Sequence, residues 1–492
     1  MDKILDAVAK VNGFVNDIVW GWPVIILILG TGLLLTVMTR ALQIRKFGDS
    51  LGSTIVPAVK SIASKNRKDG VSPFEAFATA ISGTVGTGNI IGVTAAILTG
   101  GPGAVFWMWI SAFFGMVTNY SENVLGVYFR KKSDDGTYKG GAFYYIYYGL
   151  KWRWLAYVAA AFTALAAIGM SGAQTNKISA SITNAIGQDT QLAKLIVGIC
   201  VAALVAVIIL GGIKRISKVA ATLVPFMSLL FIVMAVIGIC MHITNVGTAF
   251  ALIFSSAFGV KALAGGVTGY IFSTVIKKGM ARGVFSNEAG LGSSVIAHSV
   301  SNTKEPVKQG LWGVFEVFFD TFIICTLTAL LFLTNIDAAT INADMPDTAT
   351  IMGVFSSNFG VFGTVVFTVI LPLFAFTTIM AWSFYGEKAV EFIFKKGSAK
   401  TQKAAVLVFK LIYIALIVVS AIITSSLAWD ISDTFNGLMS IPNLICLVAL
   451  SGLVAKITNN YYKRKKGENV EPMLSAYPEL NEEMKASVDK EN

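Results

Sequence analysis

The stretch Ser82–Asn89 lies inside an apolar segment, 74–98, that is long enough to cross a bilayer. It contains Gly83, Gly86 and Gly88, and each glycine in a helix interior costs about 1 kcal/mol against alanine. In hydrocarbon a broken helix also leaves backbone groups unpaired, unless protein or a polar cavity satisfies them. The stretch therefore predicts an interrupted spanning helix that lines a binding site. A small-residue seam for close helix packing remains the alternative.

The composition places this segment in a membrane protein. Of 492 residues, 55% are hydrophobic and 14% are charged, whereas soluble domains carry about 25% charged residues. We expect an all-α polytopic membrane protein embedded in a lipid bilayer. The net charge of +11 does not indicate a nucleic-acid partner, because the basic residues gather in loops on one side. The four cysteines lack metal-site spacing, so neither disulfides nor a bound metal is expected.

The apolar runs predict about eleven transmembrane helices. In chain order they are 18–39, 74–98, 104–129, 155–186, 193–211, 220–242, 269–298, 312–333, 361–394, 406–426 and 435–457. Residues 243–268 read as an outer loop with re-entrant or interfacial helices, and 138–150 as an interfacial helix. No loop could hold a soluble catalytic domain, and the first span lacks a clear cleavage site.

Lys and Arg fall in alternate loops, which predicts the orientation in the cell membrane. They are dense at 40–68, 130–132, 214–218, 304–308, 395–403 and 463–466, and absent from 335–358. This pattern puts the N-terminus, 1–17, outside and the C-terminus inside, although the basic residues at 261–282 do not fit it. The polar tail, 458–492, is predicted to be disordered in the cytoplasm.

A second interruption, Phe285–Gly292, combines two glycines with Ser, Asn and Glu288 inside another apolar span. The two broken spans are the second and the seventh, so their starts lie five spans apart. Broken helices at matching positions of two five-span halves are typical of inverted-repeat transporters. The alternative is a kinked packing helix.

Charged groups inside the spans are costly unless paired. Lys177 is a candidate partner for Glu288. Glu316 and Asp320 share one face of a span. They could bind a cation or relay protons, but we favour the interpretation that they face a wet cytoplasmic vestibule. No clustered nucleophile, metal set or acid–base pair supports a membrane-embedded enzyme.

Uncharged polar groups in the spans have two interpretations each. Gln174 could reach a ligand or bond a neighbouring helix. Adjacent hydroxyls of Thr377 and Thr378 could ligate a small hard cation, although such threonines more often bond back to their own helix. Trp382, in mid-span, could wall a pocket or fill the core.

With these residues in view, the chain resembles the alanine or glycine:cation symporter family of sodium-coupled amino-acid transporters. The resemblance spans the membrane part and is carried by Gly83–Asn89, Gly100–Trp107, Ala281–Gly292 and Trp382–Glu387. It implies a LeuT-type 5+5 inverted repeat with one extra N-terminal helix: 18–39 first, then halves at 74–242 and 269–457.

The resemblance also implies site residues. The substrate would bind at Thr87, Gly88, Asn89, Gln174, Phe285, Ser286, Gly290 and Trp382. Its carboxylate would meet the first break, its ammonium the region of Phe285 and Ser286, and its side chain would end against Phe285 and Trp382. Sodium (Na+) would lie between the carbonyls of Ser82 and Val85 and the hydroxyls of Thr377 and Thr378, with a second Na+ near Thr84, Asn89 and Ser286.

We therefore expect a symporter that imports a small neutral amino acid, alanine or glycine, with Na+ by alternating access, and no obligate protein partner. Glutamine or another neutral amino acid, coupling to protons through Glu288, and a channel or sensor on the same fold remain alternatives.

Overall fold

The computed structural model describes residues 2–488 apart from 55–69, 134–135, 259–267, 338–339, 343 and 424. Part of the basic run predicted at 40–68 and the basic residue at 261 lie outside the described residues. The described chain is almost entirely helical, with one short antiparallel hairpin of β1 (Lys131–Lys132) and β2 (Tyr138–Lys139).

The first half of the chain contains the helices α1 (Asp2–Val19), α2 (Trp22–Met38), α3 (Leu42–Arg45), α5 (Pro73–Thr84), η1 (Gly88–Gly92), α6 (Val93–Gly100), α7 (Ala104–Tyr128), α8 (Ala142–Tyr144), η2 (Tyr145–Gly149), α9 (Arg153–Ala185), α10 (Gln191–Ile209) and α11 (Gly212–Met241). The second half contains η3 (Ile243–Asn245), α12 (Val246–Ala257), α13 (Thr268–Asn287), α14 (Ser294–Ser299), α15 (Pro306–Val317), η4 (Phe318–Cys325), α16 (Thr326–Asn335), α17 (Asp347–Ile393), α18 (Ala399–Ser420), α19 (Ser425–Lys465) and α20 (Pro478–Val488).

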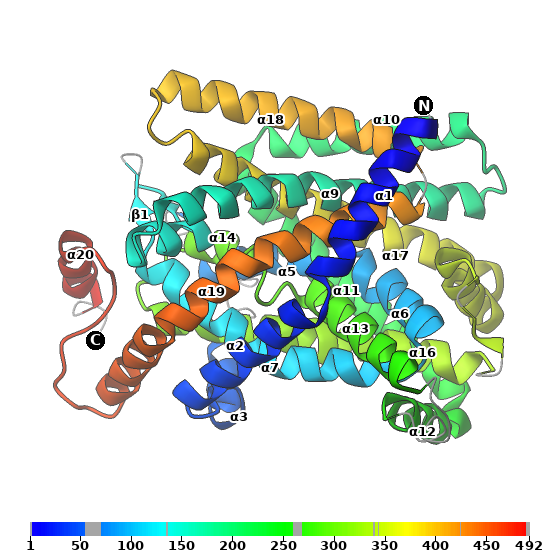
Figure 1. The fold of residues 1–492 in the computed structure, drawn as a ribbon, viewed down its shortest axis with the longest axis horizontal. Helices are drawn as coiled ribbons and strands as arrows, with labels where there is room; N and C mark the ends of the chain where they lie inside the picture. The colour runs from blue at the N-terminus through cyan, green and yellow to red at the C-terminus, as the bar shows by residue number, and fades with distance from the viewer. Residues whose placement is uncertain are drawn as a thin grey trace.

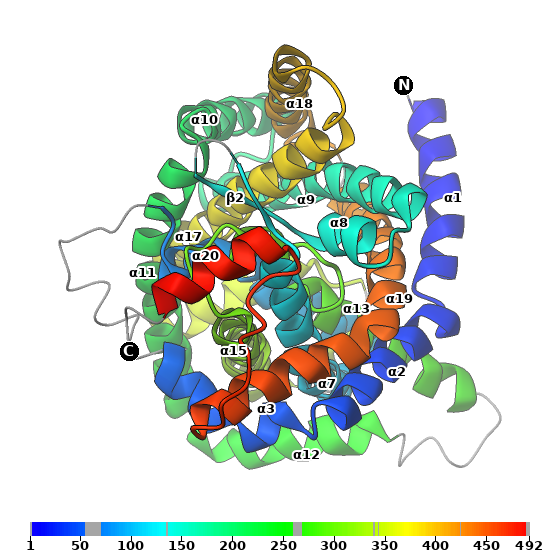
Figure 2. The same cartoon turned by 90° about the vertical axis from the view of Figure 1, so that its left-hand side faces the viewer.

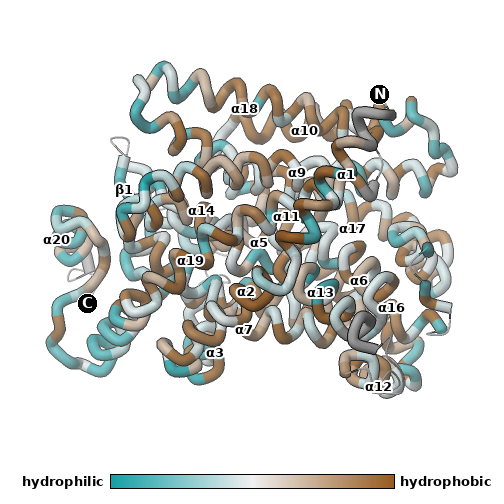
Figure 3. The backbone as a smooth tube through the Cα atoms, viewed as in Figure 1, coloured by the Kyte–Doolittle hydropathy of each residue, from teal (hydrophilic) through white to brown (hydrophobic). Residues whose placement is uncertain are grey.

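Among the described residues, seven helices are long and apolar enough to cross a membrane, and two bent pairs, α1–α2 and α5–α6, raise that number to nine. Adding α7 and the interrupted α13–α14 would give the eleven predicted spans, and that count stays a prediction. The helices α10 and α18 are apolar along most of their length, whereas the tail around α20 is hydrophilic (Figure 3).

The spanning helices form two packed groups. The first is built on α7, against which α13, α14 and α15 pack, together with the broken pair α5–α6. The second consists of α9, α10, α17 and α18, with α17 lying along α9 and α18 against α10. In Figure 1, α9, α10 and α18 form the upper part of the molecule and α7 lies in the lower part. The broken helices run between the two groups, where α5 contacts both α14 and α17.

Local sequence explains where the first broken helix starts and stops. Ser72 and Glu75 form a capping box, in which the Ser72 hydroxyl accepts from Glu75 N at 3.1 Å and the Glu75 carboxylate from Ser72 N at 2.9 Å. The helix ends at Thr84, and a π-helical turn begins at Gly88. The two halves are bent by 47°, which confirms the predicted interruption.

The second interruption is confirmed as well. Helix α13 ends at Asn287 and α14 begins at Ser294. Between them Glu288, Gly290 and Gly292 have φ angles of 55°, 89° and 76°. Glycine adopts this left-handed region freely, whereas Glu288 is held there at a cost of about 1 kcal/mol or more.

The two termini are more ordered than their sequences suggest. Residues 2–19 form the helix α1, which packs against α19, and the placement of 1–17 outside the membrane stays a prediction. The prediction of a disordered tail at 458–492 is wrong for the described residues, because α19 continues to Lys465 and α20 follows. Figure 2 looks onto the end of the molecule across which α20 lies.

Helix α12 occupies the expected outer loop, and 138–150 forms β2, α8 and η2.

Candidate functional site

The two broken helices meet at Asp320, which lies on the π-helical segment η4. Its carboxylate accepts from Asn89 Nδ2 at 2.6 Å and from Ser286 Oγ at 2.8 Å. Thr321 Oγ1 donates to the same carboxylate at 2.8 Å. All of these side chains are buried, and Cys325 Sγ lies 3.3 Å from Ser286 Oγ. The two carboxylate oxygens of Asp320 and the hydroxyl oxygens of Ser286 and Thr321 thus lie together at the junction of the breaks.

The first break also contacts α9 through Gln174. Gln174 Oε1 accepts from Thr87 N at 3.1 Å and from Thr87 Oγ1 at 2.8 Å. Its other polar atom, Nε2, is buried with no hydrogen-bond partner among the described residues. Buried amide nitrogens are rarely left unpaired in proteins. Gln174 therefore presents an unused donor at the break.

Phe285 packs directly on the first break. A Cβ added at Gly88 would lie 3.2 Å from the Phe285 ring, so the absence of a side chain at Gly88 lets the ring approach closely. The amide of Asn89 closes the turn, since its Oδ1 accepts from Gly86 N at 2.9 Å. The predicted residues Thr87, Gly88, Asn89 and Phe285 are thus brought together with Gln174 and Ser286.

Of the threonine pair on α17, Thr378 lies against the same break, whereas the Thr377 hydroxyl contacts Met227 Sδ of α11 at 3.6 Å. A Cβ at Gly86 would clash with the Thr378 hydroxyl. Both hydroxyls donate to the Phe374 carbonyl, each at 3.0 Å. This bonding to the same helix leaves the oxygen lone pairs of each hydroxyl available to a cation. On α5, the hydroxyls of Ser82 and Thr84 donate to Thr79 O and Ile81 O.

Glu288 has partners other than the predicted one. Its carboxylate accepts from Trp382 Nε1 at 2.9 Å and from Ser293 Oγ at 2.5 Å. The expected pairing with Lys177 is wrong: Lys177 Nζ lies 2.8 Å from an oxygen of Asp347, at the start of α17. Trp382 is fully buried and packs against Tyr385, with ring centroids 5.5 Å apart.

Glu316 and Asp320 do not face a wet vestibule, because both are completely buried. Glu316, on α15, lies one turn before Asp320. Its Oε2 lies 2.7 Å from Nε2 of His298 on α14. Gln309 Nε2 lies 2.6 Å from His298 Nδ1. One oxygen of the buried Glu316 carboxylate, Oε2, is thus paired within the protein.

The Arg282–Asp433 ion pair and the Trp429 ring cover the side of Phe285 that does not face Gly88. Arg282 Nη2 lies 2.8 Å from Asp433 Oδ2 of α19. The Phe285 and Trp429 rings are 4.9 Å apart, and the Arg282 guanidinium lies 5.0 Å from the Trp429 centroid. Trp20 Nε1 donates to the Asp433 carbonyl at 3.0 Å. These residues close the site toward the end of the molecule where the Lys177–Asp347 pair lies.

The sequence prediction missed several residues that the fold brings to the site, namely Asp320 as a partner of both breaks, and Arg282, Trp429 and Asp433. Of the predicted residues, Gly290 contributes a carbonyl that accepts from Asn443 Nδ2 at 2.9 Å. Within the described residues no group of three or more His, Cys, Asp or Glu could hold a metal ion.

Comparison with known proteins decides the family. The family model described as "Sodium:alanine symporter family" matches residues 5–475. The chain belongs to the sodium:alanine symporter family. It is 37% identical to the sodium/alanine symporter AgcS of Methanococcus maripaludis, over 94% of this chain and 99% of the relative. It is 34% identical to the probable sodium/glutamine symporter GlnT of Bacillus subtilis, over 95% and 92%.

Solved structures support the LeuT-type fold for this family member. The chain matches MhsT in complex with L-phenylalanine with a TM-score of 0.56 and 14% identity, over 80% of this chain and 99% of MhsT. A Na+-coupled sialic acid symporter matches with a TM-score of 0.51 and 14% identity, over 92% and 88%. This sodium:alanine symporter family member is therefore a multi-pass membrane transporter, a cation-coupled amino-acid symporter and not an enzyme.

Proposed function

We propose that this symporter imports alanine or glycine with Na+ by alternating access. The single observation that carries the proposal is the unpaired donor of Gln174, held beside the first break opposite Phe285. The relative AgcS, named a sodium/alanine symporter, supports a small substrate. Glutamine remains the alternative because GlnT is a relative of similar identity.

The substrate carboxylate would bind the backbone N–H groups of the break at Thr87, Gly88 and Asn89, and the Gln174 amide. Thr87 N and Asn89 N now donate to Gln174 Oε1 and Gly86 O, so the carboxylate would replace these acceptors at the start of the helix, where the helix dipole favours an anion. The ammonium would meet carbonyls near Phe285, Ser286 and Gly290. The bulk of Phe285 and Trp382 would limit the substrate side chain to a methyl group or hydrogen.

Two cation sites follow from the oxygen atoms. One would use the carbonyls of Ser82 and Val85 with the hydroxyls of Thr377 and Thr378, supported by the close approach of Thr378 to Gly86. The second would use Thr84, Asn89 and Ser286, and we add Asp320, whose carboxylate already accepts from both amide and hydroxyl. A carboxylate there would offset the charge of a buried cation.

Cation binding and substrate binding would be coupled through the backbone of the first break. Each cation fixes the same backbone that binds the substrate carboxylate, so each ligand lowers the ordering cost of the other. One charge moving through 100 mV supplies about 2.3 kcal/mol, enough for roughly fifty-fold accumulation. We propose that the chain has two inverted five-helix repeats at 74–242 and 269–457 in the cell membrane, the N-terminus outside and the C-terminus in the cytoplasm.

The deciding experiment is uptake of labelled alanine, glycine and glutamine into proteoliposomes, with and without an inward sodium gradient. Sodium-dependent accumulation of alanine or glycine is expected. Accumulation of glutamine alone would mean that the substrate is glutamine and not alanine or glycine. Uptake driven by a proton gradient without sodium would refute sodium coupling, and passive equilibration without accumulation would indicate a channel.

A further inference from the structure

The C-terminal segment 471–488, here called the strap, folds back onto the end of the molecule from which α19 emerges. Helix α19 stops at a turn in which Gly467 has a φ of +85°. Asn460 then holds the returning chain: its Nδ2 donates to Glu471 O at 2.8 Å and its Oδ1 accepts from Met473 N at 3.2 Å. Arg464 anchors the turn to the start of α15 through two hydrogen bonds to Glu305, at 2.6 and 2.9 Å.

The strap contacts the last turn of α7. Ala476 N donates to Tyr128 O at 2.9 Å and the Tyr477 hydroxyl to Phe129 O at 3.2 Å. Carbonyls at a helix C-terminus lack partners within the helix, so the strap supplies donors that α7 needs. Lys132, on β1, also forms an ion pair with Glu483 of α20.

The same strap residue contacts the second group of helices. The Tyr477 ring lies 6.1 Å from that of Tyr148 in η2, the segment that leads into α9. Lys131 Nζ lies over both rings, 4.2 Å from the Tyr148 centroid and 5.3 Å from that of Tyr477. Tyr477 therefore joins the end of α7, in the first group, to η2, which leads into α9 of the second group.

The strap also connects to the segment around the end of α14, beyond the second break. Its buried Leu474, Leu480 and Met484 pack with Tyr138 of β2. The Arg130 guanidinium stacks on Tyr138 at 3.7 Å from the ring centroid. Arg130 is fully buried and donates to carbonyls of Ser299 and Ser301 that follow α14. A continuous set of contacts thus runs from the strap to the segment beyond the second break.

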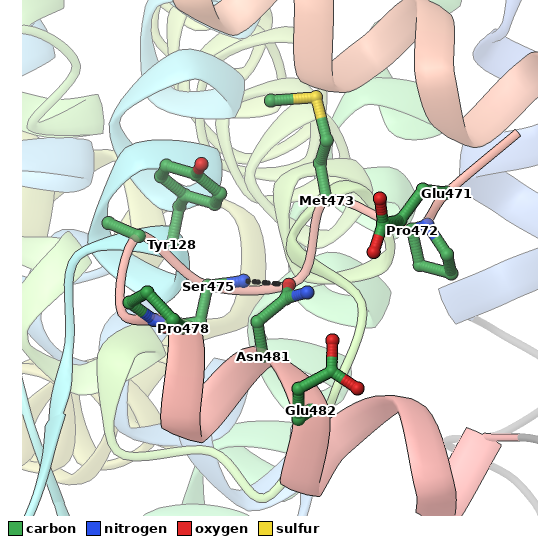
Figure 4. Close-up of a pocket in the computed structure, with 9 residues that line it drawn as sticks. Tyr128, Glu471, Pro472, Met473, Ser475, Pro478, Asn481 and Glu482 are labelled. Atoms are coloured by element: carbon green, nitrogen blue, oxygen red, sulfur yellow. Dashed lines mark hydrogen bonds between the residues drawn. The ribbon is translucent and has the colours of Figure 1, made fainter.

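Packing of the strap is incomplete. Figure 4 shows the Tyr128 side chain of α7 on one side of a cavity of about 370 Å³ and the strap around the other. Asn481 accepts from Leu474 N and Ser475 N at 2.9 and 3.1 Å, which fixes the strap to itself. Three apolar side chains of the strap are buried, Leu474, Leu480 and Met484, while Met473 and Ala476 are only partly buried against the main core. A segment built in this way can lift as a unit while keeping its own fold.

We propose that the strap is a releasable latch, which holds the two helix groups together at the end of the molecule bearing α20 and must detach before the site opens there. This rests on the proposed alternating access. With the strap docked, Tyr477 fixes the distance between α7 and η2. When it lifts, the groups can separate, the Arg130 contacts loosen, and substrate and cation can leave on that side.

A native thiol can report the opening without any transport. Cys325 is buried beside Asn89 and Ser286 at the junction of the breaks. In a protein with Cys200, Cys240 and Cys446 replaced, we would measure the rate at which a membrane-impermeant thiol reagent, added from the side bearing α20, labels Cys325. Tyr477→Ala should speed labelling more than the roughly fivefold expected for one lost hydrogen bond, and truncation after Gly467 should speed it at least as much.

Two substitutions refine the experiment. Tyr477→Phe removes only the hydroxyl and should give a smaller acceleration. Glu479→Ala changes an exposed side chain of the same helix and should leave the rate unchanged. Equal labelling of wild type, Tyr477→Ala and Tyr477→Phe would overturn the latch, even if the truncated protein did not fold. If the wild type showed no sodium-driven uptake, that result would count against the proposed function and not against the latch, because the labelling rates do not depend on uptake.

Discussion

Asn89 and Asp320 are joined by a hydrogen bond of 2.6 Å, although one lies in the first broken helix and the other in a π-helical turn far along the chain. Ser286 of the second broken helix bonds the same carboxylate. A single side chain therefore holds the two breaks in register. π-Helical turns often occur at functional positions, and this one directs Asp320 into the junction.

Asp320→Asn should raise the sodium concentration for half-maximal uptake about tenfold or more, because losing a charge-assisted contact costs roughly 1.5–3 kcal/mol. Uptake at varied sodium and fixed pH measures this. Asp344→Asn, at an exposed loop position, is the control and should behave as wild type. An unchanged sodium dependence in Asp320→Asn would remove Asp320 from the cation site.

Thr378→Ala should also raise the sodium requirement, with little effect on which amino acids compete for uptake. The substitution removes the hydroxyl that lies against Gly86. Thr368 is a matched control on the same helix, because its hydroxyl donates to the Thr364 carbonyl at 2.7 Å in the same manner. Equal effects of Thr368→Ala and Thr378→Ala would mean that the loss comes from helix bonding and not from a cation ligand.

Gly86→Ala should abolish uptake, since the added methyl group clashes with the Thr378 hydroxyl and separates the break from α17. Gly30→Ala, in α2, adds the same methyl group where no atom lies within 4 Å and should leave uptake intact. Size-exclusion profiles of both variants show whether the fold survives. Wild-type uptake by Gly86→Ala would contradict the close packing at this position.

Trp382→Ala should admit larger neutral side chains, because it removes a fully buried indole. Trp382→Phe should keep the small-substrate preference while losing the hydrogen bond to Glu288. Competition of labelled alanine uptake by leucine and methionine measures both. If Trp382→Ala accepted only the original substrates, the size limit would have to lie with Phe285.

Arg282→Gln and Asp433→Asn should each weaken substrate binding, and the double variant should be no worse than the poorer single one. A buried, cooperating pair has a coupling free energy of about 0.5–3 kcal/mol. Scintillation binding of labelled alanine measures all four proteins. The exposed Lys194–Asp189 pair of α10 provides the comparison, and its disruption should change affinity little. Additive losses at Arg282 and Asp433 would show that the pair does not act as one closure.

The sequence predicted the features that follow from local chemistry. Glycines inside apolar segments located both breaks, because a helix in hydrocarbon tolerates them only at a polar junction. It could not give long-range partners. Nothing in the spacing of Glu316 and Asp320 says whether their common face meets water or protein, and only the packing of α15 against α7 buries them. The partner of Lys177 likewise depends on where α17 begins.

The tail shows another limit. Residues 458–492 are polar overall, which indicated disorder. Leu474, Leu480 and Met484 are too few to stand out in composition, yet they bury themselves against Tyr138 once the hairpin provides a surface. Order in the tail comes from the rest of the chain and not from its own sequence.

The latch residue Tyr477 and its acceptor Phe129 are 348 positions apart in the chain. At about 5–20 residues per second, ribosomal synthesis makes the docking surface roughly 20–70 s before the strap that occupies it. The ribosome therefore makes the two helix groups before it makes the strap. A prematurely terminated chain that lacked residues 471–488 would carry both helix groups without the strap that we propose holds them together.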